Sequence, residues 1–360
     1  MGGVLGVLLA NKTVSSVMAT GGQLVYDLRG YRYHVFTSAG QTAPGQPNAV
    51  GAAGSFVVQK NDDNKLFDIL CVGGGGAGGT TPSTQAGAGG GGGGAVTEFF
   101  NIPITLPSPG TPVAFPVYVG VGAGYAVPTN VGGAVSIGGT QFPNGVSNPF
   151  YITTLAQFNS RFGDTPLGYT AAGGAPAGNY PSSQVSSYGY PAGASGNGNP
   201  GGDNLSFPQT ISTRRGGSGG GGAGGAGIPG SPYWPTPVSP TYSAPGTYYP
   251  TAYPSASGGI GGAGATSTIA QPDSPHGNVF GGGGGGGAGV PANFPLPVVP
   301  NASGGTGGGG YGGAWPTIFG SEGGTNTGGG GGGQGAVPSG SSGPVRYGGP
   351  GIVVVRYPYP

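Results

Sequence analysis

Alternating and continuous apolar runs near both ends of the chain predict β-strands. Residues 31–37 (Tyr-Arg-Tyr-His-Val-Phe-Thr) alternate clearly, 23–29 alternate more weakly, and 55–59 form a third short run. Period-two alternation is typical of a strand with one buried face. Residues 66–72 are almost continuously apolar, which predicts a strand buried on both faces. Residues 352–357 (Ile-Val-Val-Val-Arg-Tyr) predict a strand close to the end of the sequence.

Further strands are expected at 95–102, 112–121 and 133–137. Pro116 lies inside the second of these, and because proline cannot donate to a ladder, it suits an edge or a bulge better than a central position. No stretch shows the period of a convincing amphipathic helix, and one short helix is expected at 152–160.

Glycine dominates the rest of the chain: 91 of 360 residues are Gly and 37 are Pro. Beyond the junction at 73–79, the glycine tracts occur at 87–94, 216–227, 258–264, 281–289, 304–313 and 328–335. Collagen is excluded because no fixed Gly-X-Y triplet is present. Disorder is the alternative that such a composition raises, but aromatic residues make up 10% and charged residues only 5% of the chain. Disordered chains have the opposite bias, so an ordered assembly is expected.

One arrangement compensates the entropic cost of ordering so much glycine. In polyproline II geometry, backbone groups project outward with three residues per turn. Side-chain-free strands can approach closely enough to satisfy those groups mutually. The predicted fold is therefore mainly β with irregular structure: a β platform plus stacked polyglycine II helices, and almost no α-helix. Residues 352–357 are expected to pair near 66–72, which would bring two strand–glycine junctions together.

The composition divides the chain into four predicted parts. Residues 1–30 are assigned as an N-terminal attachment segment and 31–139 as the β platform with the first glycine tracts. Residues 140–257 are rich in Tyr and Pro and are assigned as long loops that face a receptor or partner. Residues 258–360 are assigned as the polyglycine brick, closed by the C-terminal strand 351–357.

Net charge and the lack of targeting signals exclude several classes of protein. A net charge of +1 offers no basic field for nucleic acid. No apolar window approaches the about 18–20 residues of a membrane span. The start of the chain lacks the basic region of a signal peptide, and Gly6 replaces the Ser or Thr of a myristoylation signal. The single cysteine, Cys71, reads as a small buried hydrophobic residue.

One segment matches a nucleotide-binding fingerprint. Residues 73–78 fit G-x-G-x-x-G after an apolar strand, with Glu98 about 20 residues further on. The fingerprint needs a helix next, and Gly-Thr-Thr-Pro follows instead. A chain this rich in glycine also matches by chance, and no P-loop lysine is present. No cofactor is expected.

Metal binding and catalysis find little support. His34 and His276 stand far apart in the sequence without a Cys or carboxylate cluster. Asp62, Asp63 and Asp203 lie in Asn- and Gly-rich turns, where solvated turn residues explain them better than calcium ligands. Nothing resembles a nucleophile, base and orienting residue. The chain is expected not to be an enzyme.

Aromatic residues concentrate between 140 and 257. The candidate receptor or partner contacts are Tyr180, Tyr188, Tyr190, Tyr233, Trp234, Tyr242, Tyr248, Tyr249 and Tyr253. Tyrosine supplies a large contact area at low entropic cost and suits recognition of sugars or protein loops. Alternatively, these side chains cap the glycine brick and shield it from water. The sequence leaves both interpretations open.

The order of motifs resembles a known family. In sequence, these are 33–40, 55–58, 67–76, 116–124, 132–137 and the closing strand 351–358. This order is similar to the glycine-rich domain of bacteriophage virion proteins, especially tail-fibre and other appendage proteins. The serial glycine tracts also resemble the tip adhesins of T-even-like long tail fibres, whose stacked glycine helices carry receptor-binding loops. The Tyr/Pro-rich stretch and the N-terminal segment depart from both patterns.

The resemblance implies a non-enzymatic virion structural protein, most simply a tail-fibre or appendage component with adhesin loops on the particle surface. It implies other virion proteins as partners through 1–30, a host surface glycan or outer-membrane protein as receptor, and homo-oligomers. Neither nucleic-acid binding nor membrane insertion is expected. A capsid decoration or fibre protein with a purely architectural role, and a cellular glycine-rich surface or filament protein, are the alternatives.

Overall fold

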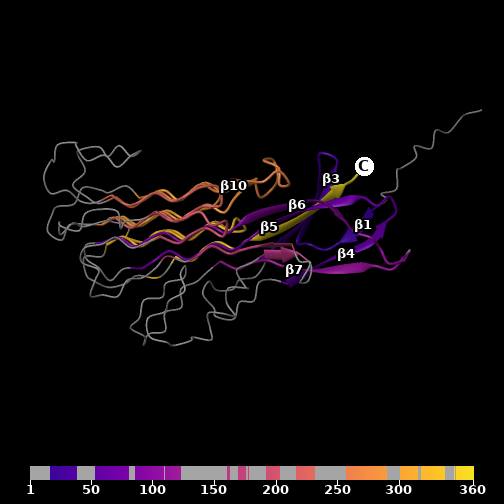
Figure 1. Ribbon diagram of the computed structural model, residues 1–360, viewed down its shortest axis with the longest axis horizontal. Helices are drawn as coiled ribbons and strands as arrows, with labels where there is room; N and C mark the ends of the chain where they lie inside the picture. Colours follow the sequence, from indigo (N-terminus) through magenta and orange to yellow (C-terminus); the bar gives the residue numbers. More distant parts are fainter. Residues whose placement is uncertain are drawn as a thin grey trace, which may run out of the picture.

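The structure is a computed structural model of the whole chain, and it is elongated, with β-strands at one end and extended tracts at the other (Figure 1). The residues that it describes are 17–38, 53–80, 86–108, 110–122, 160–162, 169–175, 177, 192–202, 216–231, 257–289, 301–314, 318–336, 344 and 346–360. Among them there is no helix, which confirms the predicted mainly β fold. No described helix is therefore available to cross a membrane.

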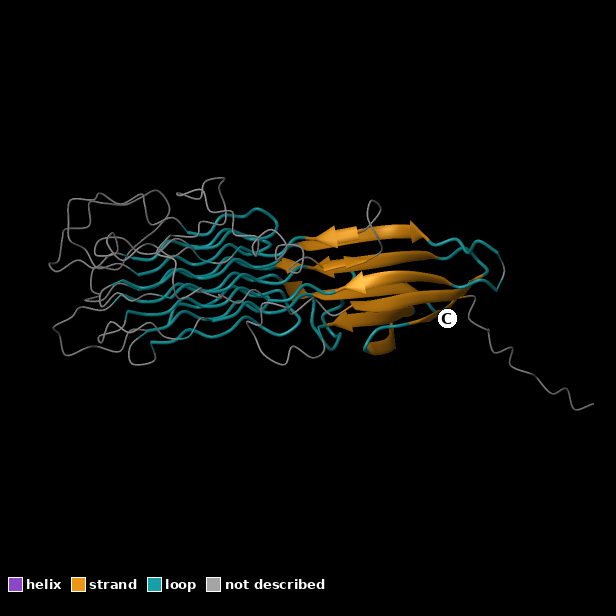
Figure 2. Cartoon of the chain, turned by 90° about the horizontal axis from the view of Figure 1, so that it is seen from below, coloured by secondary structure: helices purple, strands orange, loops and turns teal. Residues whose placement is uncertain are grey.

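Two five-stranded antiparallel sheets form the strand end (Figure 2). The first sheet has the order β1 (Val17–Thr20), β4 (Ala53–Asn61), β7 (Val113–Tyr118), β8 (Ser160–Phe162) and β9 (Tyr169–Ala171). The second has the order β2 (Leu24–Leu28), β3 (Tyr31–Thr37), β12 (Ile352–Pro358), β5 (Leu66–Val72) and β6 (Val96–Pro103). We call these two sheets together the sandwich.

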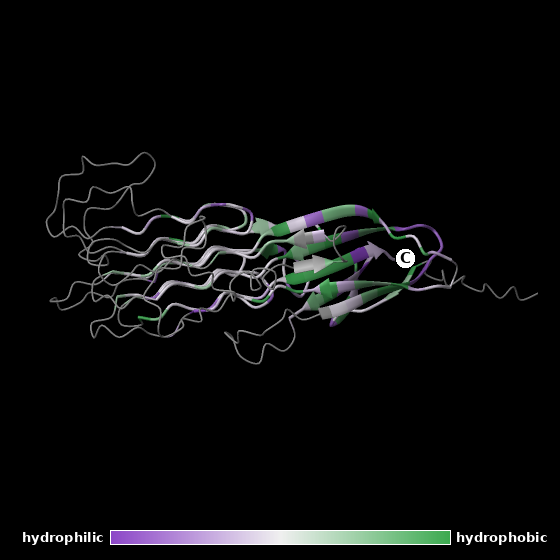
Figure 3. Ribbon diagram, turned by 60° about the horizontal axis from the view of Figure 1, so that its bottom comes forward, coloured by the Kyte–Doolittle hydropathy of each residue, from purple (hydrophilic) through white to green (hydrophobic). Residues whose placement is uncertain are grey.

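The sandwich buries an aromatic core between its sheets. Phe56 of β4 is fully buried and packs edge-on against Phe67 of β5, with ring centroids 6.0 Å apart. Phe162 of β8 and His34 of β3 contact the same ring at 5.7 and 5.1 Å. Such pairs contribute about 0.5–1.5 kcal/mol beyond the area that they bury. The most hydrophobic residues, in green, are concentrated on the strands, whereas the tracts are mostly pale, which marks intermediate hydropathy (Figure 3).

The second sheet is buried on its other face as well. Residues 265–280, which include β10 (Ala265–Thr266) and β11 (Val279–Phe280), lie across this face and are called the cover segment. Its Ile269 and Phe280 are fully buried against Leu70 of β5 and Val354 of β12. This explains the apolar runs 69–72 of β5 and 352–355 of β12, and it confirms burial on both faces for 69–72, whereas Leu66 at the start of β5 is 43% exposed.

The pairing of the C-terminal strand with 66–72 is also confirmed. β12 runs antiparallel to β5, with Ile352 opposite Val72 and Arg356 opposite Asp68. Glycine tracts therefore leave the sheet side by side: one follows Val72 and another precedes Ile352.

The proline in β7 lies where its missing N–H costs least. β7 pairs with β4 along its whole length, and Pro116 lies opposite Ser55. On its other side, β8 pairs only with Val117 and Tyr118, so Pro116 lies outside that ladder. Of the predicted helix 152–160, only Ser160 is described, and it begins β8. The strand predicted at 133–137 lies outside the described residues.

Beyond the sandwich, the glycine tracts run side by side along the long axis of the molecule (Figure 1). They are joined by backbone hydrogen bonds, and we call them the glycine bundle. Its members are 73–79, 86–95, 119–122, 172–175, 192–202, 216–231, 257–264, 281–288, 301–314, 318–336 and 346–351.

The bundle and the sandwich do not follow the four predicted parts of the chain. β1 and β2 lie within the predicted attachment segment 1–30, and each forms an edge of a sheet. Residues 172–175, 192–202 and 216–231 belong to the bundle although they fall in the predicted loop region. The tracts 172–175 and 192–202, which mix Ala, Ser and Asn with Gly, were not recognised in the sequence because they lack a long run of glycines, whereas 216–227 was recognised.

Candidate functional site

The tract 86–95 lies at the centre of the glycine bundle and is bonded to six neighbouring tracts. Its N–H groups donate in rotation to three of them, and every third residue returns to the same one. The donor and acceptor pairs are Ala88, Gly91 and Gly94 to Gln334, Gly331 and Gly328; Gly90 and Gly93 to Ser218 and Gly221; and Gly92 and Ala95 to Ala175 and Ala172. These bonds are 2.7–2.9 Å long.

The carbonyl groups of the same tract accept bonds from three further tracts with the same period. Gly89, Gly92 and Ala95 accept from Gly79, Gly76 and Gly73; Gly90 and Gly93 accept from Gly193 and Gly196; and Ala88 and Gly91 accept from Gly287 and Gly284. Along the tract, the direction of the N–H bonds rotates by one third of a turn per residue, and that of the C=O bonds does the same. The tract therefore has threefold rather than twofold symmetry about its axis, so it is not a sheet strand.

A second tract, 281–288, has the same surroundings. Its donors Gly282, Gly285 and Ala288 bond to 307–313, Gly283 and Gly286 to 259–262, and Gly284 and Gly287 to 88–91. Its carbonyls accept from 217–223, 305 and 330–336. Repetition of this pattern in two tracts shows a regular lattice of backbone bonds, each contributing about 0.5–1.5 kcal/mol net.

At its interior glycines, the lattice leaves no room for a side chain. A Cβ built on Gly91 would lie 2.2 Å from the carbonyl oxygen of Gly76, and one on Gly284 would lie 2.0 Å from that of Gly331. These neighbours are backbone atoms and cannot turn aside. The glycine composition follows from this close approach, not from a need for flexibility.

The direction of each tract shows which of its described ends lies away from the sandwich. Residue 95 leads directly into β6, and Gly73 directly follows β5, so residues 86 and 79 lie at the end of the bundle away from the sandwich. Register then places the described ends of other tracts there too: 177, 192, 202, 216, 231, 257, 289, 301, 314, 318 and 336. We call this the far end of the bundle.

All the predicted receptor or partner residues lie outside the described residues. They are Tyr180, Tyr188, Tyr190, Tyr233, Trp234, Tyr242, Tyr248, Tyr249 and Tyr253. The first three belong to the segment between 177 and 192, and the other six to the segment between 231 and 257. The described residues on both sides of each segment lie at the far end.

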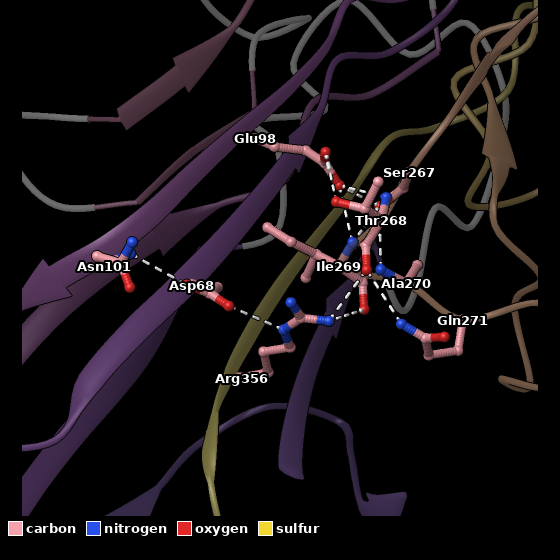
Figure 4. Close-up of polar contacts among 9 residues, drawn as sticks. All are labelled: Asp68, Glu98, Asn101, Ser267, Thr268, Ile269, Ala270, Gln271 and Arg356. Carbon is pink, nitrogen blue, oxygen red and sulfur yellow. Dashed lines mark hydrogen bonds and ion pairs between the residues drawn. The ribbon is translucent and has the colours of Figure 1, made fainter. Parts of the chain in front are cut away.

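A polar cluster fixes the cover segment to the second sheet (Figure 4). Glu98 of β6 accepts hydrogen bonds from the Ser267 Oγ (2.6 Å), from the Thr268 N–H (2.7 Å) and Oγ1 (3.1 Å), and from the Ile269 N–H (2.9 Å). Charged acceptors make stronger bonds than neutral ones. Glu98, the acidic residue that follows the G-x-G-x-x-G match in the sequence, therefore binds backbone and hydroxyl groups of the chain itself.

Arg356 of β12 holds the same segment from the other side. Its Nε pairs with the Asp68 carboxylate at 3.0 Å, and its Nη1 donates to the carbonyl oxygens of Thr268 and Ile269 at 3.0 Å each. The guanidinium carbon lies 4.7 Å from the centre of the Tyr31 ring. Asp68 also accepts from the Asn101 N–H, 3.0 Å away. The cluster binds the chain to itself and presents no free catalytic group.

Four other residues singled out from the sequence have structural surroundings, whereas Asp203 lies outside the described residues. Cys71 is fully buried, and burial raises the pKa of its thiol. His34 is buried between the Gly21 carbonyl (2.8 Å) and the Tyr357 hydroxyl (3.3 Å), and burial lowers its pKa. Asp62 and Asp63 pair with neighbouring lysines at the surface.

The described part of the chain contains no arrangement of residues typical of a metal, nucleotide or small-molecule site. No group of three metal-ligating side chains occurs there. The fingerprint residues 73–78 continue as a bonded tract of the bundle and no helix follows within 73–80. A shallow cleft of about 230 Å³ is smaller than typical ligand pockets; it is lined by Asp27, Leu28, Arg29, Gly30, Tyr31, Tyr359 and Pro360.

Comparison with known proteins adds one finding. The sequence model of a family described as "Glycine-rich domain" matches residues 49–295, which is more than half of the chain. No curated protein and no solved structure matches the chain.

Proposed function

Because the chain belongs to the glycine-rich domain family, we propose that it is a non-enzymatic structural protein that displays loops at the end of a rigid shaft. The observation that carries this proposal is the common location of the tract ends. The described residues flanking 178–191, 203–215, 232–256, 290–300 and 315–317 all belong to the far end of the bundle. Segments joined there share one end of the molecule, opposite to the sandwich.

The shaft is assigned as a stack of polyglycine II helices. Threefold rotation of the backbone bonds in tracts 86–95 and 281–288, six neighbouring tracts around 86–95, and the absence of room for a Cβ at their interior glycines support this assignment. A lattice of backbone bonds is rigid without a hydrophobic core, and it frees the connecting segments from any role in folding. Their sequences can then vary with the ligand.

We assign the protein to the bacteriophage virion, as a tail-fibre or appendage component with host-recognition loops. The resemblance of its motif order to glycine-rich virion proteins supports this assignment. Tyr and Trp in 178–191 and 232–256 supply the side chains that dominate binding surfaces. A host surface glycan or outer-membrane protein is the proposed receptor.

The proposed attachment region lies within residues 1–30, in the part that does not belong to the sandwich. β1 and β2 are strands of the two sheets, so 1–16 are the residues assigned to contact other virion proteins. Val17 lies opposite Asn61, at the end of the sandwich away from the bundle. Attachment there would hold the display end outward.

Replacement of six aromatic residues tests the display role. Tyr233, Trp234, Tyr242, Tyr248, Tyr249 and Tyr253 are changed together to serine, and adsorption of the particles to host cells is measured. We expect at least about a tenfold loss with an unchanged melting temperature. The matched control changes Tyr311 and Phe319 to serine, because these are 45% and 37% exposed on the bundle. It should adsorb normally.

Two outcomes would redirect the proposal. If particles carrying the six-residue variant contain the protein and adsorb normally, its role is architectural, as in a capsid decoration or fibre protein. If purified particles never contain the protein, the virion assignment is wrong and a cellular surface or filament protein becomes the better candidate.

A further inference from the structure

β2 leaves one edge of the second sheet open. It is the outermost strand of that sheet, and no other described strand pairs with its outer side. Its residues Leu24 and Val25 are 36% and 47% exposed, although both are large and apolar. An edge strand of this kind is a template for pairing with another chain.

The hairpin geometry identifies which backbone groups are available. β2 and β3 are joined by Arg29 and Gly30, both with positive φ, and the closing pair is Leu28 with Tyr31. In a two-residue hairpin the closing pair exchanges both hydrogen bonds, and alternate pairs along the ladder do the same. The backbone groups of Val25 and Asp27 therefore point away from β3, toward the open edge.

The other sheet edges in the described part of the chain are obstructed. β1 has four residues and a register shift between Met18 and Ala19. β6 carries a register shift, and it packs against β9 through the Phe99 and Tyr169 rings, 4.8 Å apart. Bulges of this kind are ways in which proteins prevent edge pairing. In contrast, β2 keeps an unbroken register over Leu24–Leu28.

Asp27, the one charged residue of β2, is paired with a cation of the neighbouring strand β3. Both carboxylate oxygens of Asp27 accept from the Arg32 guanidinium, at 2.7 and 2.8 Å, and this bond lowers the pKa of the carboxyl group. A net charge of +1 also leaves little repulsion between whole copies of the chain.

We propose that β2 pairs antiparallel with β2 of a second copy of this chain, about a twofold axis at Tyr26. In this register Val25 lies opposite Asp27 of the partner copy, and Asp27 lies opposite its Val25. These two pairs use all the available backbone groups of both strands. On the outer face, Leu24 lies opposite Leu28 and the two Tyr26 side chains are neighbours, so apolar residues meet apolar residues.

The small size of this interface limits the affinity of the dimer, and the direction of β2 sets how the two copies are oriented. A five-residue strand pair is smaller than the roughly 1,200 Å² of a stable interface, so dimerisation depends on concentration. Antiparallel pairing of β2 makes the two long axes antiparallel, and the two glycine bundles extend in opposite directions. This inference does not depend on the proposed receptor binding.

Sedimentation velocity of the full chain, from about 1 µM to about 1 mM, tests the edge. Val25→Asp places an aspartate opposite Asp27 of the partner copy and should weaken dimerisation about tenfold. Val25→Lys places a cation there and should dimerise as well as or better than the wild type. Met18→Asp is the matched control, since Met18 is 51% exposed on β1, at the edge of the first sheet, and it should leave dimerisation unchanged.

Disulfide cross-linking tests the register. Tyr26→Cys brings two thiols together at a non-hydrogen-bonded pair, where the Cα separation is within disulfide range. This variant should form a covalent dimer under mild oxidation, whereas Leu24→Cys alone should not. A wild-type chain that stays monomeric throughout the range, equal effects of Val25→Asp and Met18→Asp, or cross-linking of Leu24→Cys alone would each overturn the proposal.

Discussion

At the residue scale, glycine in this chain is a packing residue. Its value is the missing Cβ, which lets carbonyl oxygens approach the Cα atoms of neighbouring tracts. The sequence predicted this use from the contrast between abundant glycine and scarce charge. It could not show which glycines are essential, because position in the lattice, and not local sequence, decides what a Cβ would meet.

Gly91→Ala should destabilise the protein, because the new Cβ would lie 2.2 Å from the Gly76 carbonyl oxygen. Overpacking of this kind costs about 1–3 kcal/mol or more. Chemical denaturation measures the loss. Gly225→Ala is the control, since its Cβ would meet no atom nearer than 3.9 Å. Equal stability of the two variants would mean that tract 86–95 does not pack as described.

A buried histidine gives the sandwich a pH dependence. Burial lowers the pKa of His34 from its usual 6.5, so the unfolded chain takes up the proton first as the pH falls. Stability should therefore be constant well above pH 6.5 and decrease as the pH falls below it. Asp27, whose pKa is lowered by Arg32, acts only below about pH 3.8.

Melting temperatures between pH 5 and 8 measure this effect. His276, whose pKa burial also lowers, contributes in the same window. His34→Gln should remove part of the slope, and the double variant with His276→Gln should remove most of the rest. A slope that survives in the double variant would exclude these two imidazoles as its source.

At the element scale, strands were the most predictable part of the chain. Alternation located 31–37, and continuous apolar character located 66–72 and 352–357, together with their pairing. The tracts 172–175 and 192–202 were missed because their Ala, Ser and Asn residues resemble loop composition. The cover segment was also missed. Its apolar residues Ile269 and Phe280 are isolated in the sequence, and only the fold brings them together.

Glu98 should be essential for holding the cover segment. Glu98→Ala would leave the Thr268 N–H and the hydroxyl groups of Ser267 and Thr268 without their acceptor, and the Ile269 N–H with only the Ser267 hydroxyl oxygen. A hydrogen bond to a charged group contributes about 1.5–3 kcal/mol, so a loss of at least about 2 kcal/mol is expected. Hydrogen exchange should increase across 265–280. Glu322→Ala, at an exposed position, should change neither quantity; unchanged exchange in Glu98→Ala would refute the role of the cluster.

At the scale of the whole molecule, the fold joins two ways of burying backbone. The sandwich uses apolar side chains over sheet ladders, and the glycine bundle uses backbone bonds alone. The sequence predicted both parts and also their continuity at two junctions, where β5 and β12 extend directly into glycine tracts. The candidate binding residues were predicted from composition alone. They stay a prediction, because the structure describes only the tract ends that flank their segments.

The threefold bonding of the tracts is the central claim, and residue-resolved amide exchange of the intact protein tests it most directly. In the outer tract 257–264, Gly259 and Gly262 donate to one neighbour and Gly261 and Gly264 to another, whereas Ile260 and Ala263 donate to no described residue. The account predicts slow exchange at the four bonded amides and fast exchange at every third residue, Ile260 and Ala263. A period of two along this tract would indicate a sheet strand, and uniformly fast exchange would show that the bundle does not exist.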